Sequence, residues 1–271
     1  MHSSTVLSLT RRPFQDLKWS KEDLPVFVID GQLFRKKPPT SPVRGSYAYA
    51  IGASQSDLES LVAVSAPRTM HLRAFKGKSL APLADVGHLQ EVILDVCKNL
   101  DDLSSLRNLT MLDTLVLNSA AKVKNLSFLD GCDSLQAVGL SGGMESRKRV
   151  ATLAPLANLR SMVELAIESL VSDRDGLRPL AKCPRLKRLS LPNLFETEDY
   201  AFLAAALPHV ECEMLVPHTR LPFIIKGKDT MITGKGKPFL HSTEDKEQIR
   251  AYEASFDTLK ARFSSELAAL R

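Results

Sequence analysis

The sequence predicts an α/β solenoid, in which short parallel strands stack beside one another. Apolar residues recur in blocks of six positions with spacings of 3, 3, 3, 3 and 2, and these blocks follow one another at a regular interval. Leucine dominates the apolar residues, whereas aromatic residues make up only 6% of the 271 residues. The core is therefore expected to be built from one repeated side-chain shape, as in stacked repeats.

Five blocks share this pattern, and successive blocks are separated by 23, 23, 27 and 24 residues. The closing step of two matches a strand, because alternate side chains of a strand point to one face. The steps of three match a 3₁₀-like or extended return segment. A helical bundle would instead need a mixed period of 3 and 4. The last two positions of the blocks are Val92 and Leu94, Leu115 and Leu117, Val138 and Leu140, Leu165 and Ile167, and Leu189 and Leu191.

Degenerate copies flank the five blocks at residues 71–75 and 207–215. The pattern resembles the short class of leucine-rich repeats, about 22 residues long, found in regulators of protein phosphatase 1 and in bacterial internalins. The resemblance covers residues 70–215 and implies a horseshoe with short parallel strands on its concave face. The consensus asparagine that ties neighbouring turns together is missing, so we expect an irregular or strongly twisted stack. That column holds Cys97, Ala120, Gly143, Leu170 and Leu194.

Both ends of a solenoid need a cap, because each end would otherwise expose an apolar layer. Residues 1–69 are expected to form an N-terminal capping region, with a hairpin turning at Asp30-Gly31, a further strand in SYAYAI and one helix. Residues 216–271 are expected to form strands and an amphipathic helix over residues 243–270. This helix either caps the last repeats or mediates self-association. Its apolar stripe comprises Ile249, Tyr252, Phe256, Leu259, Phe263, Leu267 and Leu270.

The remaining composition indicates a cytoplasmic protein without a membrane span, since no apolar run approaches the roughly 18 residues that a span needs. The first residues place an arginine pair after a short apolar patch, which is the wrong order for a signal peptide. The four cysteines fall at core positions and are interpreted as reduced, buried thiols. No catalytic, cofactor-binding or metal-binding pattern is found, and Gly234–Lys237 (GKGK) is interpreted as a basic turn rather than a phosphate-binding loop.

The strand face offers the best candidate site. Its central column is expected to hold Arg73, Ile93, Val116, Gly139, Ala166, Ser190 and Glu211. Flanking columns add acidic side chains, which would attract a basic protein and repel nucleic-acid phosphates. The residues that we predict to bind a partner are Glu91, Ile93, Asp95, Val116, Asn118, Glu164, Glu168, Arg188 and Glu211.

The net charge of +5 resides in the flanks, because residues 70–215 carry 17 basic and 18 acidic side chains. Nucleic-acid binding is therefore the alternative function, through basic flanks and a flexible loop holding Arg147, Lys148 and Arg149. The flanking lysines concerned are Lys226, Lys228, Lys235 and Lys237. The leading prediction is a non-enzymatic protein-interaction module without a cofactor. An immunity protein that neutralises a basic toxin, or an effector with a host target, would fit it.

Overall fold

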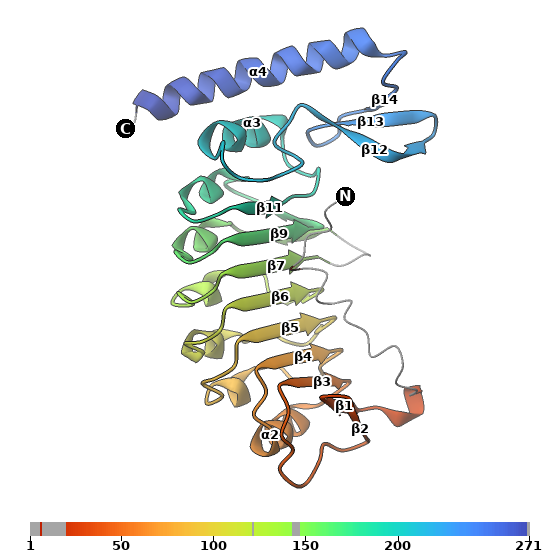
Figure 1. Ribbon diagram of the computed structural model, residues 1–271, viewed down its shortest axis with the longest axis vertical. Coiled ribbons are helices and arrows are strands. Elements are labelled where there is room, and N and C mark those ends of the chain that lie inside the picture. Colours follow the sequence, from red (N-terminus) through yellow and green to blue (C-terminus); the bar gives the residue numbers. More distant parts are fainter. Residues whose placement is uncertain (1–5, 7–19, 121, 143–146, 270–271) are drawn as a thin grey trace.

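A computed structural model describes residue 6 and residues 20–120, 122–142 and 147–269, and it shows a solenoid of stacked strands (Figure 1). Nine strands form one sheet in the order β11-β9-β7-β6-β5-β4-β3-β1-β2. The predicted leucine-rich-repeat solenoid is confirmed by this sheet and by the returns between its strands. The repeat strands are β4 (Thr69–Arg73), β5 (Glu91–Asp95), β6 (Thr114–Asn118), β7 (Ala137–Ser141), β9 (Glu164–Glu168) and β11 (Arg188–Ser190).

The parallel strands pair in a uniform register. Thr69 faces Glu91, and the same column continues through Thr114, Ala137 and Glu164. No register shift interrupts the described pairs from β4 to β9, so the expected irregularity is absent from this part of the sheet. The asparagine column is dispensable here, because Cys97 directs its thiol at the carbonyl of Leu72 (3.5 Å) and Ala120 and Leu170 fill the core. Gly143 of that column lies outside the described residues.

A recurring turn after β4, β5 and β6 links each of these strands to the next repeat. Ala74, Val96 and Ser119 adopt left-handed backbone angles, with φ of 50°, 54° and 56°. Their amides donate to the carbonyls of Asp95, Asn118 and Ser141 at the end of the next strand, over 2.8, 2.9 and 3.0 Å. The left-handed residue bends the chain out of the sheet while its amide remains paired, so backbone geometry replaces the missing side-chain ladder.

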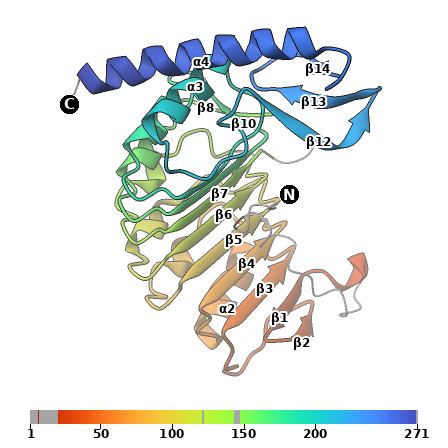
Figure 2. The same cartoon turned by 45° about the horizontal axis from the view of Figure 1, so that its top comes forward.

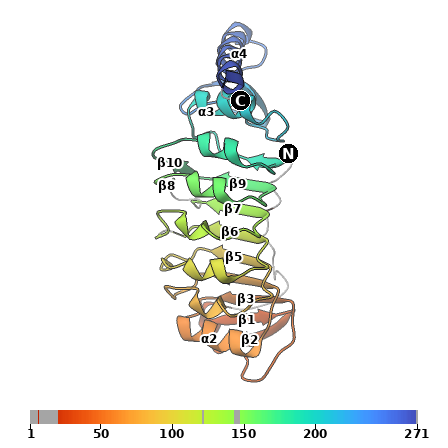
Figure 3. The same cartoon turned by 90° about the vertical axis from the view of Figure 1, so that its left-hand side faces the viewer.

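The return segments are 3₁₀ helices, as the steps of three predict, and Figure 3 views the stack from their side. Leucines at every third position, among them Leu80, Leu83 and Leu106, are fully buried. One apolar cluster therefore runs through the whole stack, from Phe27 to Phe263. The returns are Ala81–Leu83, Ser104–Asn108, Ser127–Leu129, Ala154–Asn158 and Arg178–Lys182.

The N-terminal end is capped by strands and a helix. The predicted hairpin is present as β1 (Val26–Ile29) and β2 (Gln32–Arg35), with Asp30 and Gly31 both at positive φ. The predicted third strand is β3 (Tyr47–Ile51), which pairs antiparallel with β1 and parallel with β4. The helix α2 (Gln55–Val64) begins with a capping box formed by Ser54 and Asp57. The sheet thus continues from the cap into the repeats without a break.

The C-terminal end is covered by two helices and a small sheet (Figure 2). Helix α3 (Thr197–Ala206) replaces a 3₁₀ return, and helix α4 (Lys246–Ala269) lies across it. The sheet holds β12 (His218–Ile225), β13 (Lys228–Ile232) and β14 (Phe239–Leu240). The stripe on α4 packs inward, with Phe263 edge-on to Phe202 at 5.5 Å and Arg178 placed over both rings. The cap interpretation of this helix is confirmed. Leu270 lies outside the described residues.

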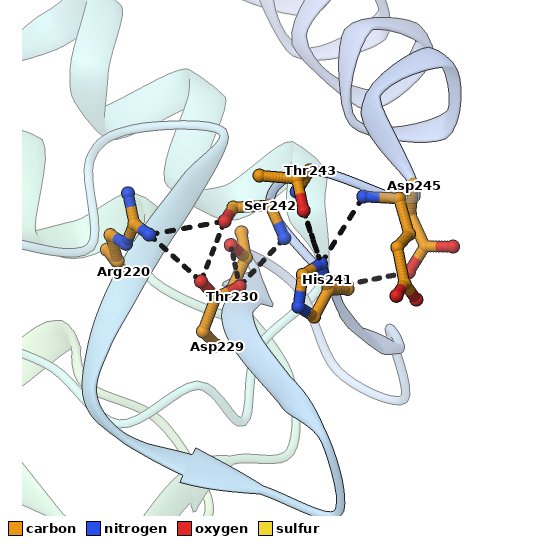
Figure 4. A network of polar contacts seen from close by, with 8 residues as sticks. Arg220, Asp229, Thr230, His241, Ser242, Thr243 and Asp245 are labelled. Atoms are coloured by element: carbon orange, nitrogen blue, oxygen red, sulfur yellow. Dashed lines mark hydrogen bonds and ion pairs between the residues drawn. The ribbon is translucent and has the colours of Figure 1, made fainter.

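A polar network joins the small sheet to the start of α4 (Figure 4). Asp229 accepts hydrogen bonds from the amide (2.8 Å) and hydroxyl (2.7 Å) of Ser242 and from Arg220 (3.1 Å). Asp245 accepts from the amide of His241 (2.7 Å) and from Lys228 (2.7 Å). These hydrogen bonds hold the pKa of both carboxyls below the ordinary value, the serine contacts dominating for Asp229 and the His241 amide for Asp245.

Candidate functional site

The outward-pointing residues of β4 to β11 form the strand face on which the candidate site was predicted. The register corrects two positions of the predicted central column. His71, not Arg73, lies opposite Ile93, while Arg73 lies opposite Asp95. Glu211 pairs with Arg188, so it belongs to the column of Glu91 and Glu164 rather than to the central one. Both errors arose from aligning the degenerate flanking copies two residues out of register.

The central column forms an apolar strip, which we define as Ile93, Val116 and Ala166. All three residues are fully buried although their side chains point away from the core, and Val6 packs with them in one cluster. Val6 itself is only 3% exposed. Burying a valine side chain contributes roughly 1.5 kcal/mol or more. Ile93 and Val116 were predicted to bind a partner, and in this structure both lie buried in the cluster that includes Val6.

Glu164 lies at the edge of the apolar strip and is nearly buried. Its Oε2 atom accepts two hydrogen bonds from Arg188, from Nε at 3.0 Å and from Nη2 at 2.7 Å. Its Oε1 atom accepts a hydrogen bond from the backbone amide of Val6 at 2.9 Å. A carboxylate with little exposure needs such partners, since desolvating an unpaired charge is costly. Glu164 and Arg188 are therefore brought together as one charged unit.

A second charged unit lies on β4 to β6. Asp95 is 3% exposed, and its Oδ1 atom accepts a hydrogen bond from Asn118 Nδ2 at 2.8 Å. Its Oδ2 atom forms an ion pair with Arg73 Nη1 at 3.4 Å. Burial raises the pKa of Asp95, while the charge of Arg73 and the hydrogen bond from Asn118 oppose the rise. Glu91 accepts from the hydroxyl of Thr69 at 2.9 Å. Two of the predicted acidic residues are thus balanced by arginines, which makes the strand face less acidic than its sequence columns indicate.

An aromatic group at the N-terminal end of the strand face was not predicted. Tyr47 Oη lies 3.0 Å from His71 Nδ1, and the ring of Tyr49 meets the ring of His71 edge-on at 4.9 Å. A signal for this group was available in the sequence. Met70, Leu72 and Phe75 are spaced 2 and 3, as are Val92, Leu94 and Cys97, and aligning these triplets places His71 beside Ile93.

The exposed part of the strand face lies towards its C-terminal repeats. Glu168, Arg188 and Glu211 are exposed there, at the ends of β9 and β11 and beside them. Asn118 and Glu91 are half-buried. The strand face therefore combines a buried apolar strip, two charged units and an exposed charged margin. Such an arrangement of apolar centre and polar rim is typical of surfaces that bind proteins.

The insertion between the third and fourth blocks does not form the predicted flexible loop in its described part. Residues Lys148–Val150 are strand β8, which pairs in parallel with β10 (Leu170–Ser172). The ammonium of Lys148 turns inward and donates to the carbonyl of Ala120, and Arg149 donates to Asp173 through Nε at 2.6 Å. Lys148 and Arg149, two of the three cations on which the nucleic-acid alternative depended in this segment, therefore have hydrogen-bond partners within the chain.

The half-buried Lys148 predicts an unusual contribution to the pH dependence of stability. Burial lowers its pKa from 10.5 to about 8. Between these values the unfolded chain binds the proton and the folded chain does not, so Lys148 makes a contribution to the free energy of unfolding that rises with pH, by on the order of 2 kcal/mol. The cysteine thiols, whose pKa burial raises, contribute in the opposite sense, so the expected result is a difference between variants rather than a net rise. From pH 8 to pH 10, urea denaturation should show that Lys148→Met loses stability relative to the wild type. Arg149→Met, at the adjacent exposed position, is the matched control and should follow the wild type over this range.

The GKGK segment is a turn between β13 and β14, as predicted, with Gly234 at φ 130° and Gly236 at φ 72°. It borders a cleft of about 680 Å³ between α3 and α4. Lys235 pairs with Glu196 at 3.6 Å, and the ammonium of Lys237 lies 5.5 Å above the ring of Tyr252. The charges at this cleft are mixed, so it does not form the basic surface that nucleic-acid binding would need.

The cysteines are free thiols, and Cys97, Cys132 and Cys183 are buried in the core as predicted, whereas Cys212, predicted to be buried as well, is half-buried. Burial raises the pKa of the Cys97 and Cys183 thiols to about 12, so these groups stay protonated at neutral pH. Among the described residues, no group of three or more histidine, cysteine or acidic side chains is arranged to hold a metal ion. In the same residues, no helix has the length and apolar character that crossing a membrane requires.

Comparisons with known proteins were made for the sequence and for the structure. No family model matches the chain, and no curated protein matches its sequence. Among solved structures, it is similar to internalin C2 of Listeria monocytogenes, with 21% identity, a TM-score of 0.47, and coverage of 62% of this chain and 69% of that one. It is also similar to a leucine-rich-repeat protein of Leptospira interrogans, with 13% identity, a TM-score of 0.29, and coverage of 59% and 57%.

Proposed function

We propose that this protein is a non-enzymatic interaction module that binds a protein partner on its strand face. The observation that carries the proposal is the apolar strip of Ile93, Val116 and Ala166, bordered by charged side chains. The apolar side chains of this strip point away from the leucine core that stacks the repeats. Their presence at three strands of one column is explained by contact with another polypeptide segment.

The margin of the strand face indicates the chemistry of the partner. Glu168 and Glu211 are exposed at the C-terminal repeats, and within the described residues neither one forms an ion pair. Basic side chains of a partner would find complementary charge there, which favours rapid and selective association. We propose a basic partner segment, and we place the function in a reducing compartment such as the cytoplasm because all four cysteines are free thiols.

Quantitative capture from the natural source tests this function. We expect the tagged chain to recover a stoichiometric protein partner, and the charge reversal Glu168→Arg with Glu211→Arg to reduce recovery at least about tenfold. The matched control is Asp133→Arg with Asp257→Arg, two exposed carboxylates outside the strand face. Equal recovery by the strand-face variant and the wild type would contradict the proposal. The identity of the captured protein also tests the immunity and effector roles.

A further inference from the structure

Val6 lies far from the repeats in the sequence, yet it packs on their strand face. It shares one apolar cluster with Ile93 of β5, Val116 of β6 and Ala166 of β9. The exposed fraction of Val6 is 3%, and that of each of the other three residues is 0%. The side chain of Ala137 adds a partly buried edge to the same cluster. An aliphatic side chain from outside the repeats therefore occupies the middle of the candidate binding surface.

The backbone of Val6 is bound as well as its side chain. Its amide donates to Glu164 Oε1 at 2.9 Å, while Arg188 holds Oε2 of the same carboxylate at 2.7 Å. Arg188 thereby fixes the orientation of the carboxylate towards the occupant. A backbone amide is common to every polypeptide, so Glu164 can recognise a segment of main chain whatever its source. The apolar strip then selects for an aliphatic side chain at that residue.

Val6 itself has helical backbone, and these two contacts are ones by which a surface can bind a residue of a polypeptide segment. We propose that Val6 is an internal ligand, which occupies the place of the partner segment and must leave before a partner binds. The partner segment would carry an aliphatic residue on the strip, with its amide on Glu164, and a basic residue near Glu168 or Glu211. This inference rests on the proposed function, because it assigns the same strand face to the partner.

Competition of this kind has a measurable size. An occupant that belongs to the same chain competes at an effective concentration on the order of 1 mM. The apparent affinity for a second ligand falls in proportion to the fraction of chains whose strip is unoccupied. An occupant whose own dissociation constant as a separate peptide is about 10–100 μM weakens the binding of a second ligand roughly tenfold to a hundredfold. Removing the side chain of Val6 should restore the full affinity for the second ligand.

The test uses the full chain and a labelled peptide that corresponds to residues 1–12. Fluorescence anisotropy compares peptide binding to the wild type with binding to Val6→Asp, whose carboxylate cannot enter the apolar strip beside Glu164. We expect the variant to bind the peptide at least about tenfold more tightly than the wild type does. The same peptide carrying Val6→Asp should not bind either protein.

Two further variants test whether the peptide binds on the apolar strip. Adding Ala166→Arg to the Val6→Asp chain should abolish peptide binding by filling the strip, whereas adding Asp133→Arg should leave it unchanged. Circular dichroism of each variant verifies that it folds. Equal binding of the peptide by the wild type and by Val6→Asp would overturn the inference. So would the absence of binding to either protein at about 1 mM peptide, which is on the order of the effective concentration of the internal occupant. Neither result would affect capture through Glu168 and Glu211, so the proposed function would be judged separately.

Discussion

Leu115→Ala should lower the free energy of unfolding by about 3–4 kcal/mol. Leu115 lies on β6, in the middle of the sheet, and its side chain is fully buried. Truncating it removes apolar contacts and leaves a cavity that the neighbouring repeats cannot close, because their strands are held in register on both sides. Each repeat of a solenoid depends on its neighbours, so the loss should affect the cooperativity of the whole stack.

Urea denaturation followed by circular dichroism measures this loss. Met111→Ala is the matched control, because Met111 belongs to the same repeat and its side chain is 49% exposed. The control should change stability by about 0.5 kcal/mol or less. If the two substitutions had equal effects, Leu115 could not belong to a packed core, and the register derived from the leucine blocks would be wrong.

Phe263→Ala should detach helix α4 from the end of the stack at a cost of about 3 kcal/mol or more. The ring of Phe263 is 2% exposed and meets Phe202 of α3 edge-on, with Arg178 placed 5.2 Å from its centre. Loss of the ring removes both the apolar contact and the aromatic pair, which adds about 0.5–1.5 kcal/mol beyond burial. The last repeats, which helix α4 then no longer covers, should unfold locally before the rest of the solenoid.

Hydrogen exchange read by mass spectrometry distinguishes this local opening from global unfolding. We expect faster exchange in α4 and α3 of Phe263→Ala, with β5 and β6 unchanged. Ser264→Ala, at the next and exposed position, should exchange like the wild type. Unchanged exchange in α4 of Phe263→Ala would show that this helix does not depend on the aromatic contact for its docking.

The repeats and the caps could be predicted because their signals are local. The spacing of the leucines fixes both the strands and the 3₁₀ returns, and Asp30-Gly31 fixes the first hairpin. Helix α3 was missed because it occupies the return of a degenerate repeat, although Glu198 and Asp199 lie in its first turn, where acidic residues are favoured. The expected irregularity is absent from β4 to β9, where backbone hydrogen bonds from Ala74, Val96 and Ser119 join neighbouring repeats without the asparagine ladder.

The candidate site could be predicted only in part. The alternation of the strands identified Ile93, Val116 and Glu164 as outward-pointing residues. Their partners could not be predicted, because a contact between Val6 and Glu164 joins residues 158 positions apart and leaves no periodic signal. The half-buried position of Lys148 was missed for a similar reason, since the pairing of β8 with β10 depends on an insertion outside the repeat pattern.

The central claim is that a protein partner binds the strand face. Site-specific photo-crosslinking tests it most directly, with a photoreactive residue placed at Glu168, at Glu211 or, as the control, at Asp133. All three positions are exposed, but only the first two lie on the strand face. We predict that the captured partner is crosslinked from Glu168 and Glu211 and not from Asp133. Crosslinking from Asp133 alone would contradict the claim and would place the partner elsewhere on the solenoid.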